Sequence, residues 1–401
     1  MLVGTLERPQ WPRCAKLAAY WLSSFTEKHI ELGIVLLSLE IHGSLLATAL
    51  TGLAFQTGKV FAVFVRVPSS PLAAAVAAIA GTGLLLYDLT SLPVCLAGTA
   101  LMAAATNYSR RWAKAGVGDV ERLKNAARIC SILSAPFFSA AVTGTLTLVA
   151  LLILARHAAH GRLAETRLTA TVVGRFQPAH LAMAVHHAHY FSYSHAVPFL
   201  FAQVFDAPPA LQGLIFYLGW VGYEVYDFVA IRASSPRFWV GHLLAAAGIV
   251  GLFSTTSPFV AALLWMATGI GGGTVVMLFD LGRRDDPDPA WNLEVVEYYG
   301  HLSGMLVLVA LAQLVTLPTI GLVAGLLALV APFPLVWRHA VPRGRAARGG
   351  DTPLGGGRTP LTSGHHRQRP PTDAISPQTR RLGWNSPCAA RPSETTTTEL
   401  P

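Results

Sequence analysis

Long apolar stretches recur along most of this chain, and each is about as long as a membrane-spanning helix. They run from near residue 14 to Arg338 and are separated by Arg, Lys, Pro or Gly. A helix needs about 20 apolar residues to cross a hydrocarbon core about 30 Å thick. Hydrophobic residues make up 52% of the 401 residues and charged residues only 13%, whereas soluble domains carry about 25% charged residues. We therefore expect an all-α integral membrane protein.

The apolar pattern divides the chain into about twelve transmembrane helices. We expect them at residues 14–38, 43–66, 71–90, 92–108, 121–138, 139–156, 179–204, 209–232, 238–255, 258–280, 293–315 and 317–337.

Arginine and lysine gather on alternate connections between these spans, for example at Arg66, Arg110 and Arg232. Because cytoplasmic loops of membrane proteins are enriched in these residues, the pattern puts both termini in the cytoplasm of a multi-pass protein of the cell membrane. The net charge of +9 indicates attraction to anionic lipid headgroups. Nucleic acid is not an implied partner.

The two halves of the chain look duplicated. Phe25 and His29 match Phe191 and His195 at one offset, and Arg66 matches Arg232 at the same offset. Internal repeats are a recurrent construction of transporters. We therefore expect two six-helix pseudo-repeats.

Composition then divides the chain into five parts. The tail is expected to be disordered because it is basic, rich in Pro, Gly and Thr, and has few apolar residues. The parts are a cytoplasmic N-terminus at 1–13, an N-terminal six-helix bundle at 14–156, a central cytoplasmic linker at 157–178, a C-terminal six-helix bundle at 179–338 and the tail at 339–401.

Two six-helix halves, cytoplasmic termini, a central linker and a polar first helix in each half resemble the major facilitator superfamily of secondary transporters. That family carries a Gly-x-x-x-Asp-x-x-Gly-Arg-Arg type of loop between its second and third helices. Here the position reads Arg66-Val67-Pro68-Ser69-Ser70. The resemblance therefore concerns architecture, and it assigns no functional residue.

Charged residues inside spans are expensive, so they indicate a cavity, a partner or a nearby interface. The first span contains Glu27, Lys28, His29 and Glu31. Glu27 and Glu31 share one helical face, and His29 points the other way. An interfacial elbow before a span that starts near Ile30 is the alternative interpretation.

The seventh span is polar nearly all round, which favours a place beside a cavity. Pro198 follows its polar residues and can kink the helix. Imidazoles are common metal ligands, so His186 and His189 are an alternative metal site. The polar residues are His180, His186, His187, His189, Tyr190, Tyr193 and His195.

Other spans add fewer polar residues. Glu224 and Asp227 lie three residues apart in the eighth span, and Lys59 in the second is expected to extend to the inner interface. The polar turn from Glu294 to His301 is interpreted as a solvated helix end.

These features favour a transporter that moves a small molecule across the cell membrane, by proton-coupled export with alternating access. The alternative is an integral membrane enzyme that uses a histidine-bound metal on a hydrophobic substrate. No catalytic residue, resident metal or cofactor is predicted, the expected partners are a small-molecule substrate and the lipid bilayer, and the oligomeric state is open. The candidate substrate and proton pathway comprises Glu27, His29, Glu31, His187, His189, Tyr193, His195, Glu224 and Asp227.

Overall fold

The computed structural model describes residues 11–64, 71–117, 120–158, 178–229, 235–275, 278 and 289–335, and within them it is helical without strands. The first helices are α1 (Trp11–His42), α2 (Leu45–Phe64), α3 (Pro71–Tyr87), α4 (Leu92–Val117), α5 (Glu121–Ser134), the 3₁₀ helix η1 (Ala135–Phe137) and α6 (Ala140–Ala158). They are followed by α7 (Pro178–Phe191), α8 (Ala196–Phe199), the π-helix η2 (Leu200–Val204), α9 (Pro209–Val229), α10 (Ser235–Ser254), α11 (Pro258–Gly273), α13 (Pro289–Leu314) and α14 (Leu317–Val330).

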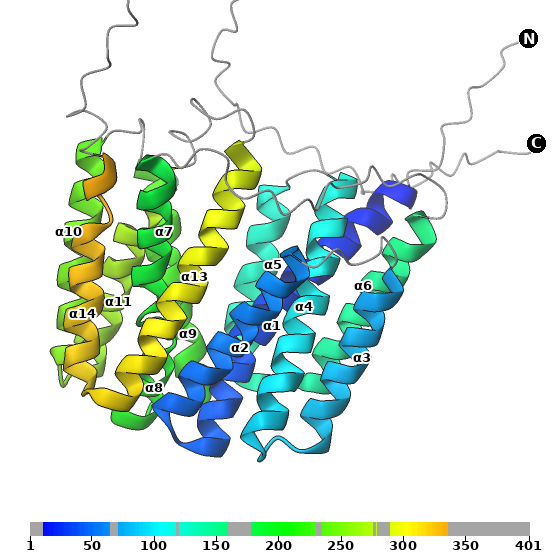
Figure 1. The fold of residues 1–401 in the computed structure, drawn as a ribbon, viewed down its shortest axis with the longest axis horizontal. Coiled ribbons are helices and arrows are strands. Elements are labelled where there is room, and N and C mark those ends of the chain that lie inside the picture. The colour runs from blue at the N-terminus through cyan, green and yellow to red at the C-terminus, as the bar shows by residue number, and fades with distance from the viewer. Residues whose placement is uncertain are drawn as a thin grey trace, which may run out of the picture. The chain divides into compact units, whose positions relative to one another are not determined.

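The helices pack in two groups (Figure 1). In the first group, α1 and α4 each contact several of the other helices among α1–α6. In the second, α9 packs on α11, α10 packs on α11 and α14, and α7 packs on α13. The two groups meet where α2 packs against α13 and where α5 packs against α9.

Three described stretches are long and apolar enough to cross a membrane, namely Leu45–Val63, Val295–Leu314 and Leu317–Leu335. Shorter apolar helices occur at Pro71–Tyr87, Ala140–Arg156, Phe238–Ser254 and Pro258–Gly273. Large apolar side chains are exposed on their outer faces. On α3 these are Leu72, Val76, Ile79 and Leu86. A stripe of this kind suits contact with lipid and would be an aggregation site in water.

Local sequence explains where several helices begin and end. Proline stands at the first position of α3, α7, α9, α11 and α13, where its missing N–H removes no helical hydrogen bond. Ser257 caps α11 by accepting a hydrogen bond from the Val260 N–H. Gly43 ends α1 with a φ of +59°, a conformation that glycine adopts without strain.

The connection between α3 and α4 is a tight turn built on Asp88. Its carboxylate accepts hydrogen bonds from the Thr90 hydroxyl at 2.6 Å and from the Ser91 N–H at 3.1 Å. These hydrogen bonds lower the pKa of Asp88 because they favour its charged form.

The seventh span differs from its prediction, which was one continuous helix over 179–204. Helix α7 ends at Phe191, a turn covers residues 192–195, and α8 and η2 follow. Pro198 lacks the N–H that would bond to Ser194, so the regular helical ladder cannot pass through this position. The π-helix after it bonds the Phe205 N–H to the Leu200 carbonyl at 3.1 Å.

The first span is longer than expected. Helix α1 starts at Trp11 and runs without a break to His42, so the alternative interpretation, an interfacial elbow before Ile30, is wrong. The predicted tail at 339–401, most of the linker at 157–178 and the loop at Arg66 lie outside the described residues.

Candidate functional site

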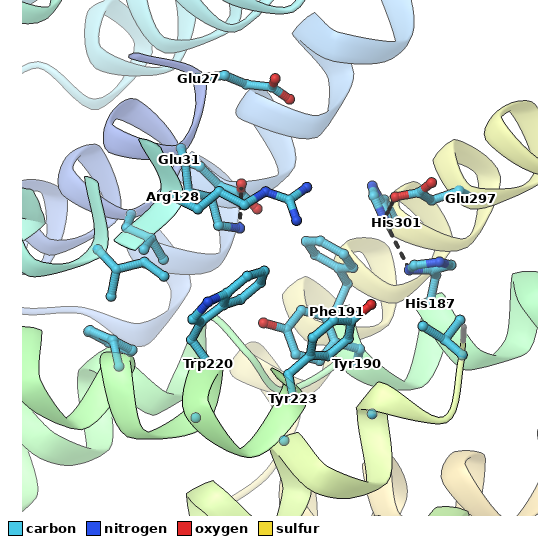
Figure 2. Close-up of a pocket in the computed structure, with 18 of the residues that line it drawn as sticks. Glu27, Glu31, Arg128, His187, Tyr190, Phe191, Trp220, Tyr223, Glu297 and His301 are labelled. Carbon is cyan, nitrogen blue, oxygen red and sulfur yellow. Dashed lines mark hydrogen bonds and ion pairs between the residues drawn. The ribbon is translucent and has the colours of Figure 1, made fainter. Parts of the chain in front are cut away.

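A cavity of about 240 Å³ lies between the two helix groups. Helices α1, α2, α4 and α5 line one side, and α7, α9, α11 and α13 line the other. Figure 2 shows that Glu27, Glu31 and Arg128 face His187, Glu297 and His301 across it. The described lining carries five Lys or Arg side chains, namely Lys28, Lys59, Arg110, Lys124 and Arg128, and three carboxylates, namely Glu27, Glu31 and Glu297.

Glu27 is the centre of a buried ion-pair network. Its side chain lies in α1, 6% of the residue is exposed, and Oε1 lies 3.2 Å from Nζ of Lys59 on α2. Arg110 on α4 pairs with the other carboxylate oxygen. One carboxylate thus holds two cations from two different helices, which ties α1, α2 and α4 together.

Glu31 lies one turn further along α1. Its Oε2 accepts a hydrogen bond from Lys28 Nζ at 2.8 Å, and Gln56 Nε2 approaches Oε1 at 3.5 Å. Glu31 is buried, whereas Lys28 is partly exposed to the cavity. Like the Glu27 network, this pair joins a buried carboxylate to a partly exposed cation of the cavity wall.

The prediction that Lys59 extends to the inner interface is wrong. Only 6% of the residue is exposed, and its ammonium group pairs with Glu27. The same ammonium lies 5.6 Å from the ring centre of Tyr298 on α13. A buried carboxylate within reach is a better partner for a lysine than a distant interface.

His187, Glu297 and His301 form a group on the opposite wall, which we call the outer histidine group. His301 Nε2 lies 3.2 Å from His187 Nδ1 and 3.5 Å from Glu297 Oε1. Tyr298 and His301 are buried. The interpretation of this turn of α13 as a solvated helix end is therefore wrong.

His186, His189 and His242 are buried and form the inner histidine group, of which His186 also lines the cavity. His186 Nδ1 lies 2.9 Å from His242 Nε2, and His242 Nδ1 donates to the Phe238 carbonyl at 2.8 Å. The predicted alternative metal residues, His186 and His189, thus lie together with a third histidine from α10.

Two further contacts join the two helix groups. The guanidinium of Arg128 on α5 lies 5.3 Å from the ring centre of Trp220 on α9, and Figure 2 shows both at the cavity wall. The Tyr298 hydroxyl on α13 donates to Asn107 on α4 at 3.3 Å. Asn107 in turn donates to the Lys59 carbonyl at 3.0 Å.

Of the candidates from sequence, Glu27, Glu31, His187 and Tyr193 line the cavity. His29, His189, His195 and Glu224 lie outside its lining. His29 contacts the Thr143 hydroxyl at 3.0 Å, whereas His195 is buried beside Ser194. Glu224 is half-buried on α9, and the side chain of Asp227 lies outside the described structure.

Sequence reasoning did not assign Arg110, Arg128, His242, Glu297 or His301 to a site. His242 is the lone histidine of an otherwise apolar span, which is a signal that could have identified it. Glu297 and His301 stand four residues apart, on one helical face. Arg110 stands just after a predicted span, where a cytoplasmic position is the ordinary interpretation. Arg128 lies inside the predicted span 121–138, and a charged residue inside a span is a signal that could have identified it.

The fold matches solved structures of membrane transporters. A bacterial homologue of the iron transporter ferroportin, in an inward-facing state, gives a TM-score of 0.57 at 17% identity over 82% of this chain and 99% of that chain. The peptide transporter POT in complex with sulfate gives 0.60 at 12% identity over 84% and 96%. The nucleoside transporter NupG gives 0.57 at 10% identity over 80% and 99%.

No protein-family model matches the sequence, and neither does any curated protein at a significant level. The structural likeness spans nearly the full length of each of these transporters. The chain therefore shares the all-helical fold of these solved structures, as its sequence predicts.

Proposed function

We propose that this protein is a secondary transporter that moves a small molecule across the cell membrane by alternating access. The observation that carries the proposal is the charged cavity between two helix groups. Charged side chains are costly inside a membrane and mark substrate or ion pathways there. The matched structures support the proposal, because they are described as iron, peptide and nucleoside transporters.

The two groups are proposed to be pseudo-repeat bundles, at 14–156 and 179–338, joined by a cytoplasmic linker at 157–178. Helices within each group pack mainly with one another, and few pairs pack across. Such an arrangement favours rocking of one bundle against the other around a central site.

One end of the interface between the groups is closed by apolar packing. Leu32, Leu36 and Ala49 of the first group belong to one core cluster with Phe201 and Leu308 of the second. Beyond the cavity, a Cβ added to Gly52 would lie 2.6 Å from the His195 ring and 2.7 Å from Met305. With both termini in the cytoplasm, as the positive-inside rule predicts, this is an inward-facing conformation.

Proton-coupled export is the mode we propose, with the coupling carboxylates on the cavity wall. Glu27 and Glu31 both line the cavity and both hold cations. A carboxylate that takes up a proton releases its cation, so protonation and helix packing are linked here. Glu224, which is half-buried on α9, is kept as a candidate because it is a carboxylate inside a predicted span.

Transport into proteoliposomes under an imposed pH gradient tests the proposal. Compounds that accumulate with wild-type protein should fail to accumulate with Glu31→Gln, because glutamine keeps the shape of the side chain but can neither titrate nor pair with Lys28 as an anion. Downhill exchange should be partly kept. Glu27→Gln and Glu224→Gln are measured in parallel. Glu40→Gln is the matched control, since Glu40 is an exposed carboxylate on the same helix.

If gradient-driven accumulation survives in Glu27→Gln, Glu31→Gln and Glu224→Gln, the proposal that these carboxylates carry the coupling proton is contradicted. Absence of any uptake or exchange across a broad compound panel, with well-folded wild-type protein, would contradict transport itself.

A further inference from the structure

The outer histidine group brings together three side chains that can each offer a lone pair. His187 comes from α7, and Glu297 and His301 come from successive turns of α13. Figure 2 shows the three side chains on one side of the cavity. All three line the cavity, and one ligand atom from each lies within 4.8 Å of the others.

A glycine lets the two helices come close enough for this contact. A Cβ added to Gly300 would lie 2.6 Å from the Ala184 carbonyl oxygen and 2.6 Å from Cβ of His187. Real Cβ atoms do not approach other atoms so closely, so a larger residue here would push α13 away from α7. The close approach of these helices therefore depends on glycine at the position directly before His301.

The distances suit a shared cation. Zinc binds histidine nitrogen and carboxylate oxygen at about 2.0 to 2.2 Å, and tetrahedral geometry then sets neighbouring ligand atoms roughly 3.3 Å apart. His301 Nε2 lies 3.2 Å and 3.5 Å from the other two ligand atoms. A shared proton can bridge only two of these three ligand atoms, whereas a metal ion can contact all three.

We propose that His187, Glu297 and His301 bind a divalent transition-metal ion of the Zn²⁺, Fe²⁺ or Co²⁺ type, and that this ion is the transported substrate. The substrate assignment rests on the proposed function, whereas the binding site does not. Two imidazoles and one carboxylate are ligands that such ions favour over Mg²⁺ or Ca²⁺. Three protein ligands leave the cavity side open, as suits a site that must also release its ion.

The inner histidine group is the competing site, and charge separates the two. Its three ligands are imidazoles with no carboxylate among them, so a divalent ion there would bring two uncompensated charges into the bundle. Glu297 supplies one negative charge to the outer group. On the opposite wall, Lys28 pairs with Glu31, and Lys59 pairs with Glu27.

Titration of purified full-length protein in detergent with Co²⁺ tests the site, since its visible absorption reports coordination by nitrogen and oxygen ligands. We expect saturable binding to wild type. Glu297→Gln and His301→Gln should each weaken the affinity at least tenfold, because even groups behind the ligands contribute about 10- to 100-fold. Mg²⁺ should not compete.

His180→Gln is the matched control, because His180 is a buried histidine on α7 that belongs to neither group. Its Co²⁺ affinity should equal that of wild type, as should that of His242→Gln. Thermal melting and size-exclusion chromatography establish that each variant is folded.

Unchanged Co²⁺ affinity in folded Glu297→Gln and His301→Gln would overturn the site, as would loss of binding in His242→Gln alone. Metal uptake into proteoliposomes then tests the substrate assignment separately. Binding without metal uptake would keep the site and contradict the ion as substrate. Uptake of a different compound would leave the proposed transport function intact.

Discussion

The two walls of the cavity accommodate polar side chains inside a membrane protein in different ways. The wall built from α1, α2, α4 and α5 uses full charges and ties them into ion pairs at Glu27 and Glu31. The wall built from α7 and α13 uses imidazoles that need no counter-charge, with Glu297 beside them. The stability of the first wall therefore depends on every ion-pair partner. Loss of one side chain from the second wall should lower the free energy of unfolding by less.

The largest expected effect comes from removing the charge at the centre of the first wall. Glu27→Gln leaves Lys59 and Arg110 buried without their carboxylate, and breaking a buried pair in this way costs about 3 to 5 kcal/mol. Thermal unfolding in detergent should show a marked loss of stability. Pairing the change with Lys59→Met should recover part of the loss, because the uncompensated cation is removed.

Glu40→Gln is the comparison for this experiment and should change stability by less than about 0.5 kcal/mol. Equal unfolding temperatures for Glu27→Gln and Glu40→Gln would show that the first wall does not depend on its ion pairs.

The packing of the second wall can be disrupted without replacing a histidine. Gly300→Ala places a Cβ against the Ala184 carbonyl and His187, and overpacking of this kind costs about 1 to 3 kcal/mol. Co²⁺ affinity should fall as well, since α13 must move away from α7. Unfolding and metal titration of the same preparation measure both effects.

Gly83→Ala is the matched control, because a Cβ added to Gly83 meets nothing within 4 Å. Alanine there should raise stability by about 0.5 to 1 kcal/mol through its higher helix propensity. A Gly300→Ala protein as stable as Gly83→Ala would mean that α7 and α13 pack more loosely than described.

A smaller effect is expected where the walls touch. Arg128 lies over Trp220, and a cation–π contact of this kind contributes about 0.5 to 2 kcal/mol. A double-mutant cycle with Arg128→Gln and Trp220→Leu should give a coupling energy in that range. Additive losses of stability would show that this pair contributes no coupling energy between the two helix groups.

The smallest effect is expected from the C-terminal end. The first compact unit ends at Val341, and residues beyond it have few apolar side chains. Truncation after Val341 should change neither the stability of the first unit by more than about 0.5 kcal/mol nor its Co²⁺ affinity. Loss of the folded protein on truncation would contradict this prediction.

Sequence predicted the helical architecture well because apolar length and turn residues are local properties. Thus α3 begins at Pro71 and α9 at Pro209, as expected. The polar character of α1 and α7 also indicated a cavity. The partners were not predictable, because Lys59 meets Glu27 and His187 meets His301 only through packing between distant helices. No spacing along the chain encodes those contacts, so Lys59 was assigned to the interface.

The packing of α7 on α13 through Gly300 has a consequence for kinetics. All three proposed ligands belong to the second helix group, so a rocking motion between the groups leaves their mutual distances unchanged. An ion held there would cross the membrane without exchanging one protein ligand for another. Protein ligands would then be exchanged only during capture and release of the ion, and the conformational step would not depend on the rate of ligand substitution at the metal.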